Sequence, residues 1–118
     1  MKLSALAICA VVASLSAPAI AQSKLDFTLK NDTGLTIAEL YVSPNTSEDW
    51  EEDVLGKDVL EHGASLDIAF SRTEKTCLWD LKIIDDDDDA VEWESLDLCK
   101  ASHITLMYKG GKPTAIVK

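Results

Sequence analysis

The sequence predicts a mainly β protein, either an antiparallel β-sandwich or a partly open barrel of about seven short strands. Apolar and polar residues alternate along several short segments, which is the period of a half-buried strand. Turn-forming residues recur about every 8–12 residues, as in small sandwich domains. Two cysteines, Cys77 and Cys99, bracket two apolar runs that flank five consecutive aspartates, Asp85 to Asp89. That order is typical of a β-hairpin closed by a disulfide.

Residues 1–21 have the order of a secretory signal peptide. Lys2 precedes an apolar run, and Ala19-Ile20-Ala21 offers a small-x-small cleavage site. The alternative is a membrane anchor, but the run is shorter than the roughly 20 residues that span a bilayer. We therefore expect residues 22–118 to form a single exported β domain, periplasmic or secreted, and Cys9 to leave with the leader.

The first half of this domain is expected to hold three strands, over residues 24–30, 36–42 and 65–71. In the first strand Leu25, Phe27 and Leu29 face one way, while polar residues face the other. Residues 31–34 read as a turn. Residues 57–60 are expected to form a short extended piece.

One short helical turn is expected near residues 47–55. Ser47 is a suitable N-cap, acidic residues follow it, and Gly56 suits a helix C-terminus. Trp50 and Val54 would then share a face.

The second half is expected to hold four strands, the two hairpin arms and then residues 102–108 and 114–118. Trp79, Leu81 and Ile83 should face the core from the first arm, opposite Val91 and Trp93 on the second. Residues 109–113 contain two glycines and a proline and read as a turn.

Without the leader, two cysteines remain, and an even number in an exported domain favours a Cys77–Cys99 disulfide. Closing this loop would constrain the unfolded chain by roughly 3 kcal/mol. A zinc site is disfavoured, because two cysteines without nearby histidines do not complete the metal's ligand shell.

The chain is acidic, with a formal net charge of −10. Such a protein repels nucleic acid and anionic lipid. We expect no nucleic-acid partner and no membrane insertion of the mature chain, which should be monomeric. Divalent cations and basic proteins remain possible partners.

The aspartate run is the candidate metal site. In an extended segment Asp85, Asp87 and Asp89 would fall on one side, with Glu92 continuing the acidic surface. Hard cations such as Ca²⁺ take six to eight oxygen ligands. The EF-hand pattern fails here, because Ala90 takes its glycine position and Leu96 its glutamate position. The open alternative is a solvated turn without metal.

A second acidic cluster surrounds Trp50 and contains Glu48, Asp49, Glu51, Glu52 and Asp53. An exposed helical face explains it equally well. A shared cation site becomes plausible only if the fold brings the two clusters together.

No catalytic arrangement emerges from the sequence. His62 lies in an expected turn and His103 at a strand start, and neither belongs to a nucleophile motif. Gly110-Gly111-Lys112 lacks the spacing of a phosphate-binding loop. We predict that the protein is not an enzyme.

Three stretches resemble a family of small exported bacterial proteins with no established activity. They are Leu40-Tyr41-Val42-Ser43-Pro44 leading to Asp49-Trp50 and Val54-Leu55-Gly56, then Cys77-Leu78-Trp79-Asp80-Leu81, then Leu96-Asp97-Leu98-Cys99. In that family a glycine often closes the acidic turn, where this chain has an aspartate. Similar sequences have been labelled argininosuccinate lyase, a far longer and mostly helical enzyme, and nothing in this sequence supports that label.

The leading prediction is a non-catalytic exported domain that binds Ca²⁺ or another hard divalent cation weakly at its acidic hairpin turn. The alternative is a protein-binding module or inhibitor that uses its acidic surface. A small hydrolase is the third possibility.

Overall fold

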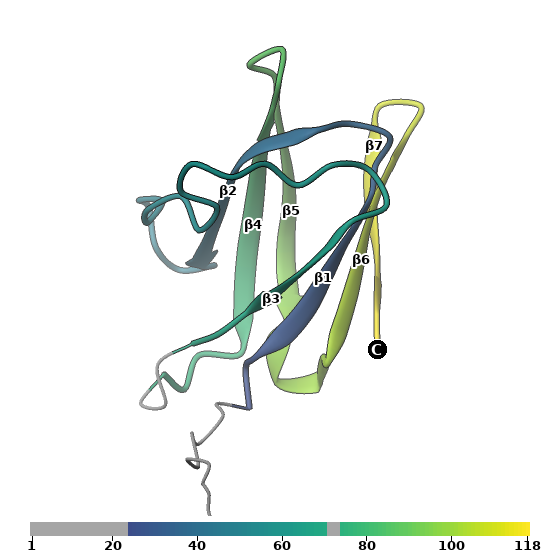
Figure 1. Cartoon of the computed structure of the whole chain (residues 1–118). Coiled ribbons are helices and arrows are strands. Elements are labelled where there is room, and N and C mark those ends of the chain that lie inside the picture. The colour runs from purple at the N-terminus through teal and green to yellow at the C-terminus, as the bar shows by residue number, and fades with distance from the viewer. Residues whose placement is uncertain (1–23, 71–73) are drawn as a thin grey trace, which may run out of the picture.

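The computed structural model describes residues 24–70 and 74–118, which form two packed β-sheets (Figure 1). One sheet has four strands in the order β3-β1-β6-β7, and the other has three in the order β2-β4-β5. The strands are β1 (Phe27–Asp32), β2 (Ile37–Pro44), β3 (Ser65–Ile68), β4 (Leu78–Asp85), β5 (Ala90–Asp97), β6 (His103–Lys109) and β7 (Lys112–Val117). The predicted mainly β fold with seven strands is confirmed, and the two sheets do not close into one barrel.

The core lies between the sheets and is built by the alternation read from the sequence. Leu25, Phe27 and Leu29 are buried on one side, as predicted. Facing side chains from both sheets complete the core, including Leu40, Val42, Trp79, Leu81, Ile83, Val91, Trp93, Ile104 and Leu106. Because burial of apolar area drives folding, this two-sided pattern selects a sandwich over a single open sheet.

The pairing of β1 with β6 differs from the prediction of an antiparallel sandwich. These two strands run parallel, with Thr28 opposite His103 and Asp32 opposite Met107, while the other strand pairs are antiparallel. Alternation reports which residues of a strand face the core, but it is the same for either direction of pairing. The direction was therefore decided by how the distant segments pack.

The helical turn predicted near residues 47–55 was wrong, because this segment forms bends followed by a turn at 54–57. Asp53 Oδ1 accepts hydrogen bonds from the N–H groups of Leu40 (2.8 Å) and Leu55 (3.0 Å), and Val54 N–H donates to Leu40 O (2.8 Å). These bonds attach the segment to the edge of β2 instead of to its own next turn. Further on, Leu60 forms an isolated bridge with Ile37.

The described helical element is a short 3-10 turn, η2 (Leu98–Lys100), where the sequence suggested the end of a strand. Asp97 caps it by accepting the N–H of Cys99 at 3.0 Å. The described part of the chain contains no helix long and apolar enough to cross a membrane.

Candidate functional site: an acidic hairpin tip and its surroundings

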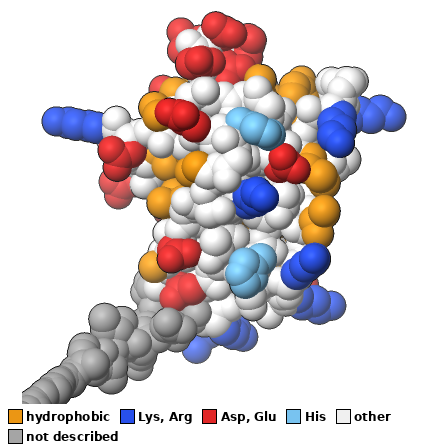
Figure 2. Space-filling view, turned by 45° about the vertical axis from the view of Figure 1, so that its right-hand side comes forward, with side chains coloured by type: hydrophobic (Ala, Val, Ile, Leu, Met, Phe, Trp, Pro, Cys, Tyr) orange, Lys and Arg blue, Asp and Glu red, His pale blue; other side chains and the backbone are white. Residues whose placement is uncertain are grey.

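The aspartate run forms the tip of the β4–β5 hairpin, which projects beyond the sheets in Figure 1. Asp88 N–H donates to Asp85 O (3.1 Å), and Asp85 N–H donates to Asp89 O (2.9 Å). Asp88 has φ 66°, in the left-handed region. This is the common three-residue hairpin loop, a type I turn followed by a left-handed residue. Acidic side chains gather at this end of the molecule in the space-filling view (Figure 2).

Asp85 differs from its neighbours because it is buried, at 5% exposure. Its Oδ1 accepts the N–H groups of Asp87 and Asp89, both at 2.9 Å. The carboxylate therefore acts as the acceptor that holds the turn closed, while the next four aspartates are exposed. A metal ion at this tip would have to share Asp85 with the backbone.

The predicted metal ligands are only partly brought together. Carboxylate oxygens of Asp85, Asp86 and Asp87 lie within 4.8 Å of one another. Asp89 and Glu92 do not belong to this group, whereas Asp86 does. An extended chain would place alternating aspartates on opposite sides, whereas the tight turn gathers consecutive residues. With one oxygen from each, these three carboxylates would supply half of the smallest oxygen set that Ca²⁺ takes.

Glu92 instead lies beside the second acidic cluster. A pocket of about 180 Å³ is lined by Glu48 and Asp49 from the segment after β2, by Asp80 of β4 and by Glu92 of β5. Trp50 lies in the same pocket, and Lys82 Nζ is 5.0 Å from the centres of both the Trp50 and Tyr41 rings. Glu92 of the first predicted cluster therefore lines the same pocket as Glu48 and Asp49 of the second. The ammonium group of Lys82 lies over the Trp50 ring.

Several motif residues have structural roles. Asp80 Oδ1 accepts the N–H of Ser95 (2.9 Å) at an irregularity in the β4–β5 pairing, where Ser95 has φ 58°. Trp79 Nε1 donates to Thr76 O at 2.7 Å. These two hydrogen bonds stabilise the hairpin and the segment that leads into it.

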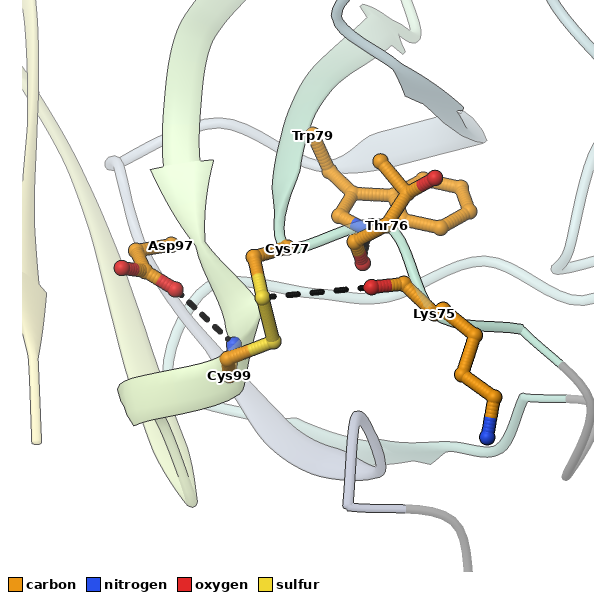
Figure 3. Close-up of a disulfide and its surroundings, with 6 residues drawn as sticks. All are labelled: Lys75, Thr76, Cys77, Trp79, Asp97 and Cys99. Carbon is orange, nitrogen blue, oxygen red and sulfur yellow. Dashed lines mark hydrogen bonds between the residues drawn. A yellow bond between two sulfur atoms is a disulfide. The ribbon is translucent and has the colours of Figure 1, made fainter.

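Cys77 and Cys99 form the predicted disulfide, with Cα atoms 5.1 Å apart (Figure 3). The bond joins the base of β4 to η2, at the end of the hairpin opposite the acidic tip. Cys77 Sγ lies 4.0 Å from Lys75 O, which is a contact rather than a hydrogen bond because a disulfide sulfur carries no proton. Asp97 lies close to both sulfurs, but disulfide-bonded cysteines supply no thiolate for a metal.

The two histidines are in different environments. His62 Nδ1 accepts the N–H of Gly34 at 2.9 Å, so it joins two turns. His103 begins β6 and is exposed. Ser102, beside it, lines a separate hollow with Asp26 and Asp67.

Most of the negative charge has no cationic partner within the described ranges, 24–70 and 74–118. The one ion pair there joins His62 Nε2 to Asp32 Oδ1 at 3.7 Å, and it requires a protonated histidine. The described lysines form none. Figure 2 shows lysine side chains mostly along the lower and right-hand edges of that face, with one more projecting at the upper left and one near the middle, and none at the acidic tip.

Fold and site together define a small two-sheet β domain with a disulfide-closed hairpin and an acidic surface that, over the described residues, is mostly without ion pairs. Comparison with protein-family models, curated proteins and solved structures gave no match. The family resemblance seen in the sequence therefore stays a prediction.

Proposed function

We propose that this chain is a non-catalytic exported domain that binds cationic ligands through its acidic surface. The observation that carries this proposal is that, in the described part of the chain, the exposed carboxylates other than Asp32 have no ion-pair partner. Unpaired carboxylates repel one another, and a cation that binds them relieves this repulsion. The proposal does not involve His62, whose Nδ1 is already bonded to Gly34.

The first candidate ligand is Ca²⁺ or another hard divalent cation at Asp85, Asp86 and Asp87. Since only three carboxylates converge there, we expect a dissociation constant in the millimolar range of extracellular calcium modules. Asp89 and Glu92 lie farther along the hairpin and would add long-range attraction rather than direct ligation.

Calorimetric titration with CaCl₂ tests this candidate. The best variant is Asp86→Asn with Asp87→Asn, because both side chains are exposed and Asp85 keeps its role in the turn. We expect this double variant to lose the binding heat. The matched control, Glu51→Gln with Glu52→Gln, removes the same charge elsewhere and should keep it. Absence of heat from the wild-type protein at several millimolar CaCl₂ would leave the tip a solvated turn.

The second candidate is a basic protein, recognised by an acidic binding module or inhibitor. The pocket lined by Glu48, Asp49 and Glu92 favours it, because these exposed carboxylates attract a lysine or arginine side chain, whereas the Trp50 ring is already covered by Lys82. Binding of such a partner should weaken steeply as salt is raised, because salt screens exposed charges.

Export is part of the proposal. The leader, residues 1–21, lies outside the described residues, so the structure adds only the disulfide, which forms in oxidising compartments. Mass spectrometry of the protein from its host should find a chain that starts at Gln22. An intact Met1 on a cytoplasmic protein would reject export.

A further inference from the structure

An apolar groove runs beside β3, on the side of the molecule away from β7. It encloses about 470 Å³ between the segment 54–60 and the start of β3, with Val54 and Val59 on one bank and Ser65 and Leu66 on the other. Val54 is 44% exposed and Val59 is 53% exposed. Both valines line one hollow, so a ligand in the groove could contact the two apolar side chains together.

The floor and the outer bank of this groove are held firmly. Leu55 and Leu60 are buried beneath it, at 8% and 5% exposure. Leu60 exchanges two backbone hydrogen bonds with Ile37, both at 2.9 Å, and Asp53 binds the N–H groups of Leu40 and Leu55. The residues next to both valines are therefore fixed by hydrogen bonds and burial. The groove is already formed without a ligand.

The inner bank is a sheet edge. β3 is the outermost strand of its sheet and pairs only with β1. Ala64 O accepts the N–H of Asn31 on the β1 side, so the alternation of an antiparallel ladder directs the backbone groups of Ser65 and Asp67 outward. An extended segment lying in the groove could pair with this edge as an added strand.

Charge selects the occupant. The chain has a formal net charge of −10, and the bank formed by residues 54–61 contributes Asp58 and Glu61 against one lysine, Lys57. Asp58 lines the groove itself, and the exposed Glu61 and Asp67 follow the lining residues Leu60 and Leu66 in the sequence. A second copy of this chain would bring the same acidic rim against itself and be repelled, whereas a basic segment would be attracted.

We propose that this groove binds an extended basic segment of a partner protein, with apolar side chains between Val54 and Val59 and lysine or arginine facing the acidic rim. The inference rests on the proposed function, because it assigns the basic partner a place and a mode of binding. It places the contact on the β3 edge, away from the hairpin tip at the junction of β4 and β5.

The test uses the ¹⁵N-labelled protein as recovered after export, titrated with a short peptide of alternating lysine and valine. A peptide of alternating lysine and serine has the same charge and no apolar side chains. We expect the first peptide to shift the amide resonances of residues 54–60 and 64–67 and the second to bind at least about fivefold more weakly.

Val59→Ser should lower the affinity for the first peptide by a similar factor, because half of this side chain is accessible to a ligand. Ile116→Ser, a change of similar exposure on β7, should have no effect.

Several results would overturn the inference. They are equal affinity for both peptides, shifts centred on residues 86–89, unchanged affinity of Val59→Ser, no binding, or self-association through the groove in sedimentation experiments. Equal affinity for both peptides would leave the proposed function standing as a purely electrostatic one. The failure of both peptides and of CaCl₂ to bind would reject the function itself.

Discussion

At single positions, aspartate carboxylates replace backbone carbonyls as hydrogen-bond acceptors. Asp53, Asp80, Asp85 and Asp97 each accept backbone N–H groups where the strands bend, turn or end, and Asp26 accepts the N–H of Phe70 at 2.7 Å. Short side chains with two acceptor oxygens suit these places. Part of the acidity seen in the sequence is therefore structural, and the exposed remainder is what a ligand could bind.

Asn31 is the buried polar residue on which the turn region after β1 depends. It is 0% exposed, and its Nδ2 donates to Leu35 O (2.8 Å) and Leu60 O (2.9 Å). Asn31→Asp keeps the shape but cannot donate to either carbonyl, so we expect a loss of about 2–4 kcal/mol in the free energy of unfolding. Urea denaturation measures it. Asn45→Asp, on a more exposed turn, should change little, and an equal loss there would point to charge rather than to the lost donors.

Asp88 has a left-handed backbone conformation that glycine adopts without strain. Asp88→Gly should therefore stabilise the protein by about 0.5–1 kcal/mol. Asp86→Gly removes the same charge at a position where φ is not positive and should be destabilising by a similar amount. Thermal unfolding of the two variants compares them directly. Equal effects of the two changes would show that charge, and not the backbone, governs the turn.

Tyr41 should lose its proton at a higher pH than an ordinary tyrosine. Its hydroxyl donates a hydrogen bond to Glu39, and this bond, together with burial and the Glu39 and Asp53 charges, raises the pKa of Tyr41 from 10.0 to about 12. Since the folded protein holds this proton more tightly than the unfolded chain, the stabilisation is complete below pH 10 and is lost as pH rises toward 12. Absorbance titration of Tyr108→Phe, which leaves Tyr41 as the one tyrosine, should give this midpoint. The stability of Tyr41→Phe should fall less between pH 10 and 12.

Among the elements, the β4–β5 hairpin has ends with opposite roles. Its base is closed by the Cys77–Cys99 disulfide and its tip carries the exposed aspartates. Replacing both cysteines by serine should lower the free energy of unfolding by about 2–4 kcal/mol. Guanidinium denaturation measures this loss. Treatment of the wild-type protein with a reductant should produce the same loss, and a double variant as stable as the oxidised protein would contradict the prediction.

For the whole molecule, like-charge repulsion should limit stability. With a net charge of −10 and almost no ion pairs in the described residues, added NaCl should raise the melting temperature by screening carboxylates from one another. Differential scanning calorimetry between low salt and about 0.5 M NaCl, where the Debye length is well below 10 Å, measures the rise. Glu51→Gln with Glu52→Gln should reduce this dependence, and a melting temperature that does not change with salt would argue against net repulsion.

Local pattern determined much of this protein. Alternation placed Leu25, Leu29, Trp79, Ile83 and Trp93 in the core, and the symmetric hairpin arms indicated the Cys77–Cys99 pair, because both depend on side-chain period and short sequence separation. Tertiary structure alone decided the parallel β1–β6 pairing, since alternation carries no direction. It also replaced the predicted helix at 47–55 with a segment held on β2, because Asp53 found backbone partners across the chain. The binding surfaces followed from that packing: Glu92 lies beside Glu48, and Val59 lies beside β3, only once distant segments meet.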